Sequence, residues 1–184
     1  MLYKSVGFQL EELKARGDEG WSFSGYASTF GNLDQGGDVV LRGAFAHSIQ
    51  SRVPKLLWQH DMTEPVGRVV KLSEDERGLH GEYKLSRTNR GHDAYQLLKD
   101  GAIDSMSIGY VPEEQEFDDA GVRLLKSVNL LEISLVSLAM NEEARVTSVK
   151  AAREDRASGE PSIVALRIEI LRKRLERRHL LEVT

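Results

Sequence analysis

The sequence predicts a mainly β protein (α+β) with short helices, built as a closed or sandwiched β domain. Apolar and polar residues alternate in many short runs, which is the pattern of half-buried strands. Residues typical of turns (Gly, Asn, Asp and Pro) separate these runs. Only two segments of the first 150 residues space their apolar residues as a helix does. Many short strands with few helices are typical of barrels and sandwiches.

The predicted elements follow in order along the chain. SVGFQLEEL and WSFSGYASTF are two strands around turn residues 16–20, and residues 31–38 form a loop rich in Gly, Asn and Asp. Residues 43–52 form a short helix that Pro54 ends. KLLWQH is a strand that ends at His60, a turn follows at residues 62–65, and VGRVVKLSED is the next strand.

Residues 76–140 are likewise predicted to form strands, with one helix among them. ERGLHGEYKLS is a strand, and NRGHDAYQLLKDGA is a helix with Gly101 as its C-cap. DSMSIGYVPEE is a strand, and residues 115–121 form an acidic turn. Residues 122–140 hold one or two strands, of which the second is very apolar.

The chain divides into a domain over residues 1–150, a linker over 151–161 and an amphipathic helix over 162–184. The linker lacks apolar periodicity and contains Ser, Gly and Pro. The predicted helix carries six Lys/Arg and three Asp/Glu, a net charge of +3, which leaves −7 on the other residues because the whole chain has −4. A basic helix on an acidic body fits a docking element for another protein, or a helix that packs on its own domain.

Composition excludes several classes of function. The chain has 184 residues, of which 40% are hydrophobic, and this suits an ordinary soluble domain. Its negative net charge gives no electrostatic case for nucleic acid as the main partner, and no apolar run is long enough to span a membrane. The absence of cysteine excludes disulfides and thiolate chemistry. The residues indicate no metal or organic cofactor.

A candidate nucleophile lies in DSMSIGY, residues 104–110. Ser105 and Ser107 share one face of the predicted strand with Gly109, and such small residues leave room for a ligand or a backbone to approach. A serine hydroxyl needs a base to take its proton. Taken alone, the pattern is more typical of a crowded sheet or a solvent-facing strand.

His60 and Glu132 are the candidate base and acid. Glu132 lies within the apolar run LLEISLVSLAM, where a buried carboxylate needs a hydrogen-bond donor, and a histidine held in one tautomer is a natural donor. An edge-strand Glu that reaches solvent explains the pattern equally well. The chain order His60, Ser107, Glu132 differs from those of the familiar serine hydrolase folds, and no G-x-S-x-G motif occurs.

Four blocks of sequence resemble one known family. They are GYASTFGNLDQGGDVVLRGAF, WQHDMTEPVGRVVKLSEDERGL, LLKDGAIDSMSIGY and LLEISLVSLAMNEEARV. In this order, within residues 3–150, they resemble the prohead (capsid maturation) proteases of tailed bacteriophages of the HK97 type. WQHDMTEPVGRV also resembles the histidine block of herpesvirus assembly proteases, and SMSIG resembles their nucleophile block.

The resemblance implies a small closed β-barrel of the herpesvirus assembly protease type, with His60 as general base and Ser107 as nucleophile. Ser107, not Ser105, stands in the S-I-G-Y position. The third catalytic residue in the herpesvirus enzymes is a second histidine, but here no histidine follows Ser107 before His179. Glu132 occupies the matching strand, so we expect it to take that role. Asn141 is a candidate oxyanion donor, although an ordinary turn residue is the better interpretation.

The implied function is serine endopeptidase activity on the major capsid protein, its scaffolding segment and the protease itself. The implied location is the immature capsid (prohead) in the bacterial host cytoplasm, and self-association is expected because the herpesvirus enzymes work as dimers. Two alternatives stay open. One is a catalytically inert scaffolding protein with the same fold, and the weaker one is an esterase, which lacks support because no lipase-type oxyanion motif appears.

Overall fold

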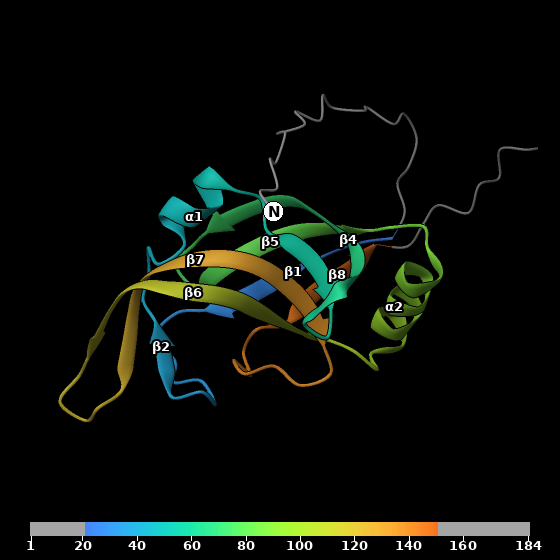
Figure 1. Ribbon diagram of the computed structural model, residues 1–184. Coiled ribbons are helices and arrows are strands. Elements are labelled where there is room, and N and C mark those ends of the chain that lie inside the picture. The colour runs from blue at the N-terminus through green and yellow to red at the C-terminus, as the bar shows by residue number, and fades with distance from the viewer. Residues whose placement is uncertain (1–20, 151–184) are drawn as a thin grey trace, which may run out of the picture. The chain divides into compact units, whose positions relative to one another are not determined.

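The computed structural model describes residues 21–150, in which one curled eight-stranded sheet carries two short helices (Figure 1). This confirms the prediction of a mainly β domain with short helices. The predicted strand before residue 16, the linker and the C-terminal helix lie outside the described residues. The strands are β1 (Ser22–Thr29), β2 (Asp38–Val40), β3 (Lys55–Trp58), β4 (Asp61–Glu74), β5 (Gly78–Leu85), β6 (Ser105–Phe117), β7 (Arg123–Val136) and β8 (Val146–Lys150).

Strand β7 organises the sheet because it pairs along both of its edges. Along one edge it pairs with β6 in antiparallel register, and along the other it pairs with β2 and β3 in parallel. The sheet then continues from β3 through β4, β5 and β1 to β8. Segments far apart in sequence, around residues 57, 107 and 134, therefore lie on three neighbouring strands.

The apolar core lies on one side of this curled sheet, where buried residues of β1 to β7 form one cluster. Alternate residues of each strand turn to this side, as the period of two in a strand requires. Ile133 and Leu135 of β7 are fully buried there, and so are Leu56 of β3 and Tyr83 of β5, with about 2% or less of their surface exposed. Glu132, Ser134 and Val136, which alternate with them along β7, turn to the other face, where the candidate site lies.

The segment that precedes β8 connects the β6 side of the sheet to β1. The Tyr26 backbone N–H donates to the Arg145 carbonyl at 3.0 Å, and the Met106 N–H donates to the Ala144 carbonyl at 2.9 Å. The Val146 N–H in turn donates to the backbone carbonyl of Asp104 at 2.8 Å. The chain therefore bridges β1 and the start of β6, and the sheet curls through part of a barrel.

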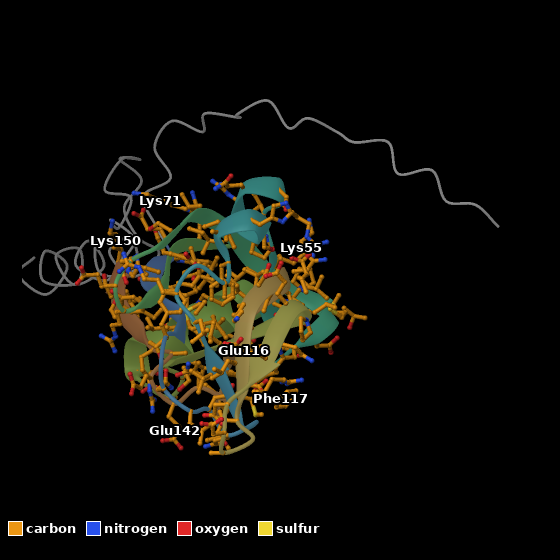
Figure 2. All side chains as sticks on the ribbon, turned by 90° about the vertical axis from the view of Figure 1, so that its left-hand side faces the viewer. Lys55, Lys71, Glu116, Phe117, Glu142 and Lys150 are labelled. Carbon is orange, nitrogen blue, oxygen red and sulfur yellow. The ribbon has the colours of Figure 1, made fainter. Side chains whose placement is uncertain are left out.

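The distal part of the β6–β7 hairpin extends away from the rest of the sheet as an arm (Figure 1), along which β2 pairs with residues 123–125 of β7. Every residue from Val111 to Phe117 is exposed. Glu116 and Phe117, labelled in Figure 2, lie toward the end of this arm. The turn that closes it runs from Asp118, whose carboxylate accepts backbone N–H groups from Ala120 and Val122. The predicted acidic turn at 115–121 thus begins later, because β6 continues to Phe117.

The two helices occur where the sequence predicts them. Helix α1 (Ala46–Ser51) lies within the predicted residues 43–52, and α2 (Asn89–Asp100) ends at Gly101. The Thr88 side chain accepts a hydrogen bond from the Gly91 N–H and so caps the N-terminus of α2. Gly101 has φ of 71°, which confirms the predicted left-handed C-cap. Within residues 21–150, neither helix is long and apolar enough to cross a membrane.

The predicted turn at residues 62–65 is wrong. These residues belong to β4, and the chain reverses at Gln59 and His60, since Trp58 pairs with Asp61. Pro65 suggested a turn because it cannot donate a backbone hydrogen bond, but it lies opposite Leu57 where the register of β3 and β4 is irregular. Strands tolerate proline at such irregularities.

Two short strands are absent from the prediction. β2 begins at Asp38, inside the predicted loop, and pairs with β7 through only three residues. β8 pairs with β1. Both are too short or too polar to show the alternation that identifies a strand.

Candidate active site

His60 lies in a two-residue turn that carries backbone strain. Gln59 and His60 have φ of 53° and 62°, in the left-handed region that side chains other than glycine rarely adopt. A two-residue hairpin of type I′ requires positive φ at both positions and normally contains Asn and Gly there. Gln and His in these positions are strained, and such strain persists where surrounding contacts fix the conformation.

Contacts with β7 fix this turn. The Gln59 N–H donates to the Leu135 carbonyl at 2.9 Å, and the Gln59 side chain donates to the Ser137 hydroxyl at 2.9 Å. The His60 N–H donates to the Ser134 hydroxyl at 3.1 Å. The imidazole is therefore carried on a turn that is bonded to the strand of the candidate acid.

Glu132 is buried and forms a hydrogen-bonded pair with His60. Its Oε1 lies 2.7 Å from His60 Nδ1, and the Glu132 side chain is 6% exposed, whereas that of His60 is 43% exposed. A Cβ atom added to Gly109 would lie 2.3 Å from the same Oε1, so the carboxylate rests directly over this glycine. The small residue at position 109 makes room for a side chain of the neighbouring strand.

This pairing sets the protonation pattern of the imidazole. A carboxylate accepts a hydrogen bond, so the nitrogen that faces Glu132 carries the proton, and Nε2 is left with a free lone pair. A neutral histidine in this tautomer can take a proton from a nucleophile through Nε2. The half-exposed imidazole beside a buried acid is the arrangement that general-base catalysis needs.

Ser107 lies on the strand next to Glu132 and on the same face. In the antiparallel β6–β7 pair, Ser107 is opposite Ser134, and Gly109 is opposite Glu132. Directly opposed residues project to one face. Ser107 is thus two residues, about 7 Å, along β6 from the glycine beneath the carboxylate. No hydrogen bond joins Ser107 to His60 within residues 21–150, and catalytic contacts are often long before substrate binds.

Ser105 shares this face, but its hydroxyl is already engaged. It donates to Asp104 Oδ1 at 2.8 Å and accepts from Arg145 Nη1 at 3.0 Å. The pKa of Asp104 is lowered, chiefly by the hydrogen bond from Ser105 and also by Arg145. The environment of Ser105 is that of a structural ion pair. Of the two serines, the one at 107 is the better placed nucleophile.

Sequence reasoning missed two residues of this site, Ser134 and Gln59. Ser134 is fully buried, and its hydroxyl donates to Glu132 Oε2 at 2.6 Å while it accepts from the His60 N–H. The strand periodicity of LLEISLV does place Ser134 on the face of Glu132, which is the one signal available. The contact with the turn depends on the parallel pairing of β3 with β7, and no local pattern encodes that pairing.

A cavity of about 260 Å³ opens beside Ser107. Asp38 in its wall is buried and accepts hydrogen bonds from the Arg123 guanidinium and from the Tyr110 hydroxyl, the latter at 2.9 Å. The Arg123 hydrogen bond lowers the pKa of Asp38, and burial together with Asp38 raises the pKa of Tyr110. The other lining residues come from four separate segments and are Ala27, Ser28, Asp34, Gly36, Val40, Ile108, Met140 and Asn141.

Asn141 anchors loops in this structure. Its amide nitrogen donates to the Thr29 carbonyl at 3.2 Å and faces the Asn32 side-chain oxygen at 3.4 Å. Its oxygen accepts from the Thr29 hydroxyl and from the Glu143 N–H. These contacts occupy the donors that an oxyanion hole requires and favour the interpretation of Asn141 as a turn residue.

Comparison with known proteins gives consistent matches. The model of the caudovirus prohead serine protease family matches residues 8–158. The prohead protease of Enterobacteria phage HK97 is 32% identical over 157 residues, which cover 82% of this chain and 70% of that protein. The prohead protease of Escherichia phage T5 is 28% identical over 69% of this chain and 62% of that protein. A capsid polyprotein of Pseudomonas phage PAJU2 is 34% identical over 85% of this chain but only 24% of its own length.

The family match covers far more than half of the chain, including the described sheet and all three candidate residues. The two prohead proteases share with the chain an identity of about 30% over most of its length. The chain is therefore a serine peptidase and belongs to the family of caudovirus prohead proteases, the enzymes of capsid maturation.

Proposed function

We propose that the protein cleaves the capsid or scaffold protein inside the prohead, with Ser107 as nucleophile, His60 as general base and Glu132 as the acid that orients His60. The observation that carries this proposal is the 2.7 Å contact between Glu132 Oε1 and His60 Nδ1 above Gly109. This contact points Nε2 of His60 away from Glu132. The pair lies on the same face of the sheet as Ser107.

The reaction proceeds by two acyl transfers. Nε2 of His60 takes the Ser107 proton as Oγ attacks the peptide carbonyl, and Glu132 stabilises the imidazolium that forms. The imidazolium then gives its proton to the leaving amine, and the C–N bond breaks. Water, deprotonated by His60, attacks the acyl-enzyme, and the proton returns to Ser107 as the acid product leaves. Backbone N–H groups meet the oxyanion in such reactions.

Three features support the substrate, the location and the finer fold. The PAJU2 relative is a capsid polyprotein, which favours capsid protein as the partner and the assembling capsid in the host as the place of action. The cavity beside Ser107 offers space for a substrate side chain. The backbone bonds of residues 144–146 to both β1 and β6 favour the closed barrel of the herpesvirus assembly proteases. Self-cleavage within residues 151–161 and self-association are parts of the same proposal.

Co-expression with the major capsid protein of the same virus tests this function. The wild-type chain is expected to shorten the capsid protein, Ser107→Ala to leave it intact, and Ser105→Ala to cut as the wild type does. Mass spectrometry of the products gives the cut sites and detects trimming of the protease itself. Capsids that assemble only with this chain present, but without any cleavage, would instead assign it the inert scaffold role.

A further inference from the structure

Ser134 is the point at which the strained turn and the buried acid meet. Its hydroxyl hydrogen goes to Glu132 Oε2 at 2.6 Å, and its oxygen accepts the His60 backbone N–H at 3.1 Å. It is fully buried, with 0% of its surface exposed. A hydroxyl can donate one bond and accept others, so both contacts are satisfied at once.

These two contacts constrain both members of the His–Glu pair. Because Oε2 is held by Ser134, the other oxygen, Oε1, is fixed toward His60 Nδ1. The second contact holds the His60 backbone at φ of 62°, a conformation that needs support from its surroundings. The orientation of the Glu132 carboxylate and the backbone position from which the His60 side chain extends therefore depend on the same hydroxyl.

We propose that Ser134 is a positioning residue of the protease, which fixes Glu132 and His60 relative to each other so that Nε2 meets Ser107. This inference rests on the proposed function, because it assigns a role within that same site. Ser134 does not take part in the chemistry itself. It acts through Glu132 and His60, and it lies directly opposite Ser107 in the β6–β7 register.

The turn has other attachments, which allows this role to be separated from a structural one. The Gln59 N–H still bonds the Leu135 carbonyl, and the Gln59 side chain still bonds Ser137, when Ser134 loses its hydroxyl. We therefore expect the hairpin to remain on β7 in Ser134→Ala, while the imidazole and the carboxylate lose their mutual alignment.

The rate at which a fluorophosphonate probe modifies Ser107 in the full-length chain measures this alignment, because the probe reports nucleophile activation without a peptide substrate. Ser134→Ala is expected to lower the second-order rate constant about 10- to 100-fold, the scale of a misplacement of about 1 Å. Ser134→Thr, which keeps a hydroxyl, is expected to recover most of the rate. Ser48→Ala is the matched control, since the buried Ser48 hydroxyl accepts the Leu130 N–H of the same strand, away from the site.

A double-mutant cycle distinguishes positioning from general loss of folding. In a Glu132→Ala background, Ser134→Ala is expected to lower the rate by a clearly smaller factor than in the wild type, because only its contact with the His60 backbone is left to lose. Equal losses in both backgrounds, or a wild-type rate in Ser134→Ala, would overturn the inference and leave the proposed function in place. Failure of the probe to modify Ser107 in the wild-type chain would overturn the proposed function, and the inference with it.

Discussion

At the scale of single residues, the candidate site depends on a glycine as much as on its polar groups. The carboxylate of Glu132 lies where a side chain at position 109 would be. The sequence indicated that Ser107 and Gly109 share a face and that Glu132 needs a donor, because strand periodicity and the cost of a buried charge are local properties. It could not show that the space above Gly109 holds the acid itself, because this depends on the register of β6 with β7.

Gly109→Ala tests this arrangement. The added methyl group displaces the carboxylate, so we expect protease activity to fall roughly 100-fold or more. The free energy of unfolding should fall by about 1–3 kcal/mol, as overpacking does. Cleavage assays and urea denaturation measure the two effects. In a Glu132→Ala background the stability cost of the same substitution should disappear, and a fully active Gly109→Ala enzyme would contradict the proposed position of the acid.

At the scale of elements, the β3–β4 turn carries His60, the proposed base. Sequence patterns identified both strands but placed the turn at residues 62–65, because Pro65 is a strong turn signal and Gln59–His60 is not. The actual turn requires positive φ at two residues that disfavour it. Bonds to β7 make it possible, and no pattern within the hairpin reveals those bonds.

Two substitutions at Gln59 measure the strain in this turn. Both Gln59→Gly and Gln59→Val lose the side-chain bonds to Ser137, so they form a matched pair. Glycine adopts positive φ freely, whereas a β-branched residue does not. We expect the valine variant to be less stable than the glycine variant by about 1–3 kcal/mol in urea unfolding. Equal stabilities would show that the turn does not keep positive φ at position 59.

At the scale of the whole molecule, β7 pairs with both β3 and β6 and so brings together candidate residues from three distant parts of the sequence. The fold class, both helices and most strands of residues 21–150 could be predicted, because each depends on local periodicity and on capping or turn residues. The parallel pairing of β3 with β7 and the short strand β2 could not, because they depend on long-range contacts. The Asp38–Arg123 pair connects β2 to β7 beside the cavity and is one such contact.

This pair gives a prediction for acid stability. Arg123 holds the pKa of Asp38 below its usual range, so the pair stabilises the fold above the unfolded-state value of about 3.9. That stabilisation is lost as the pH falls through the lower folded-state value. We expect Asp38→Asn to lower the free energy of unfolding by about 1–3 kcal/mol at pH 7, and by less at pH 2.5. Urea denaturation at both pH values measures this, and the same difference at each would contradict it.

Ser107 is the proposed nucleophile, and His60 and Glu132 are proposed to activate it. The most direct measurement is peptide mapping of the full-length protein after reaction with a fluorophosphonate. We expect one adduct, on Ser107, that is absent in Ser107→Ala and forms far more slowly in His60→Ala and Glu132→Ala. An adduct on Ser105 or Ser134, or labelling that is unchanged in Ser107→Ala, would contradict it.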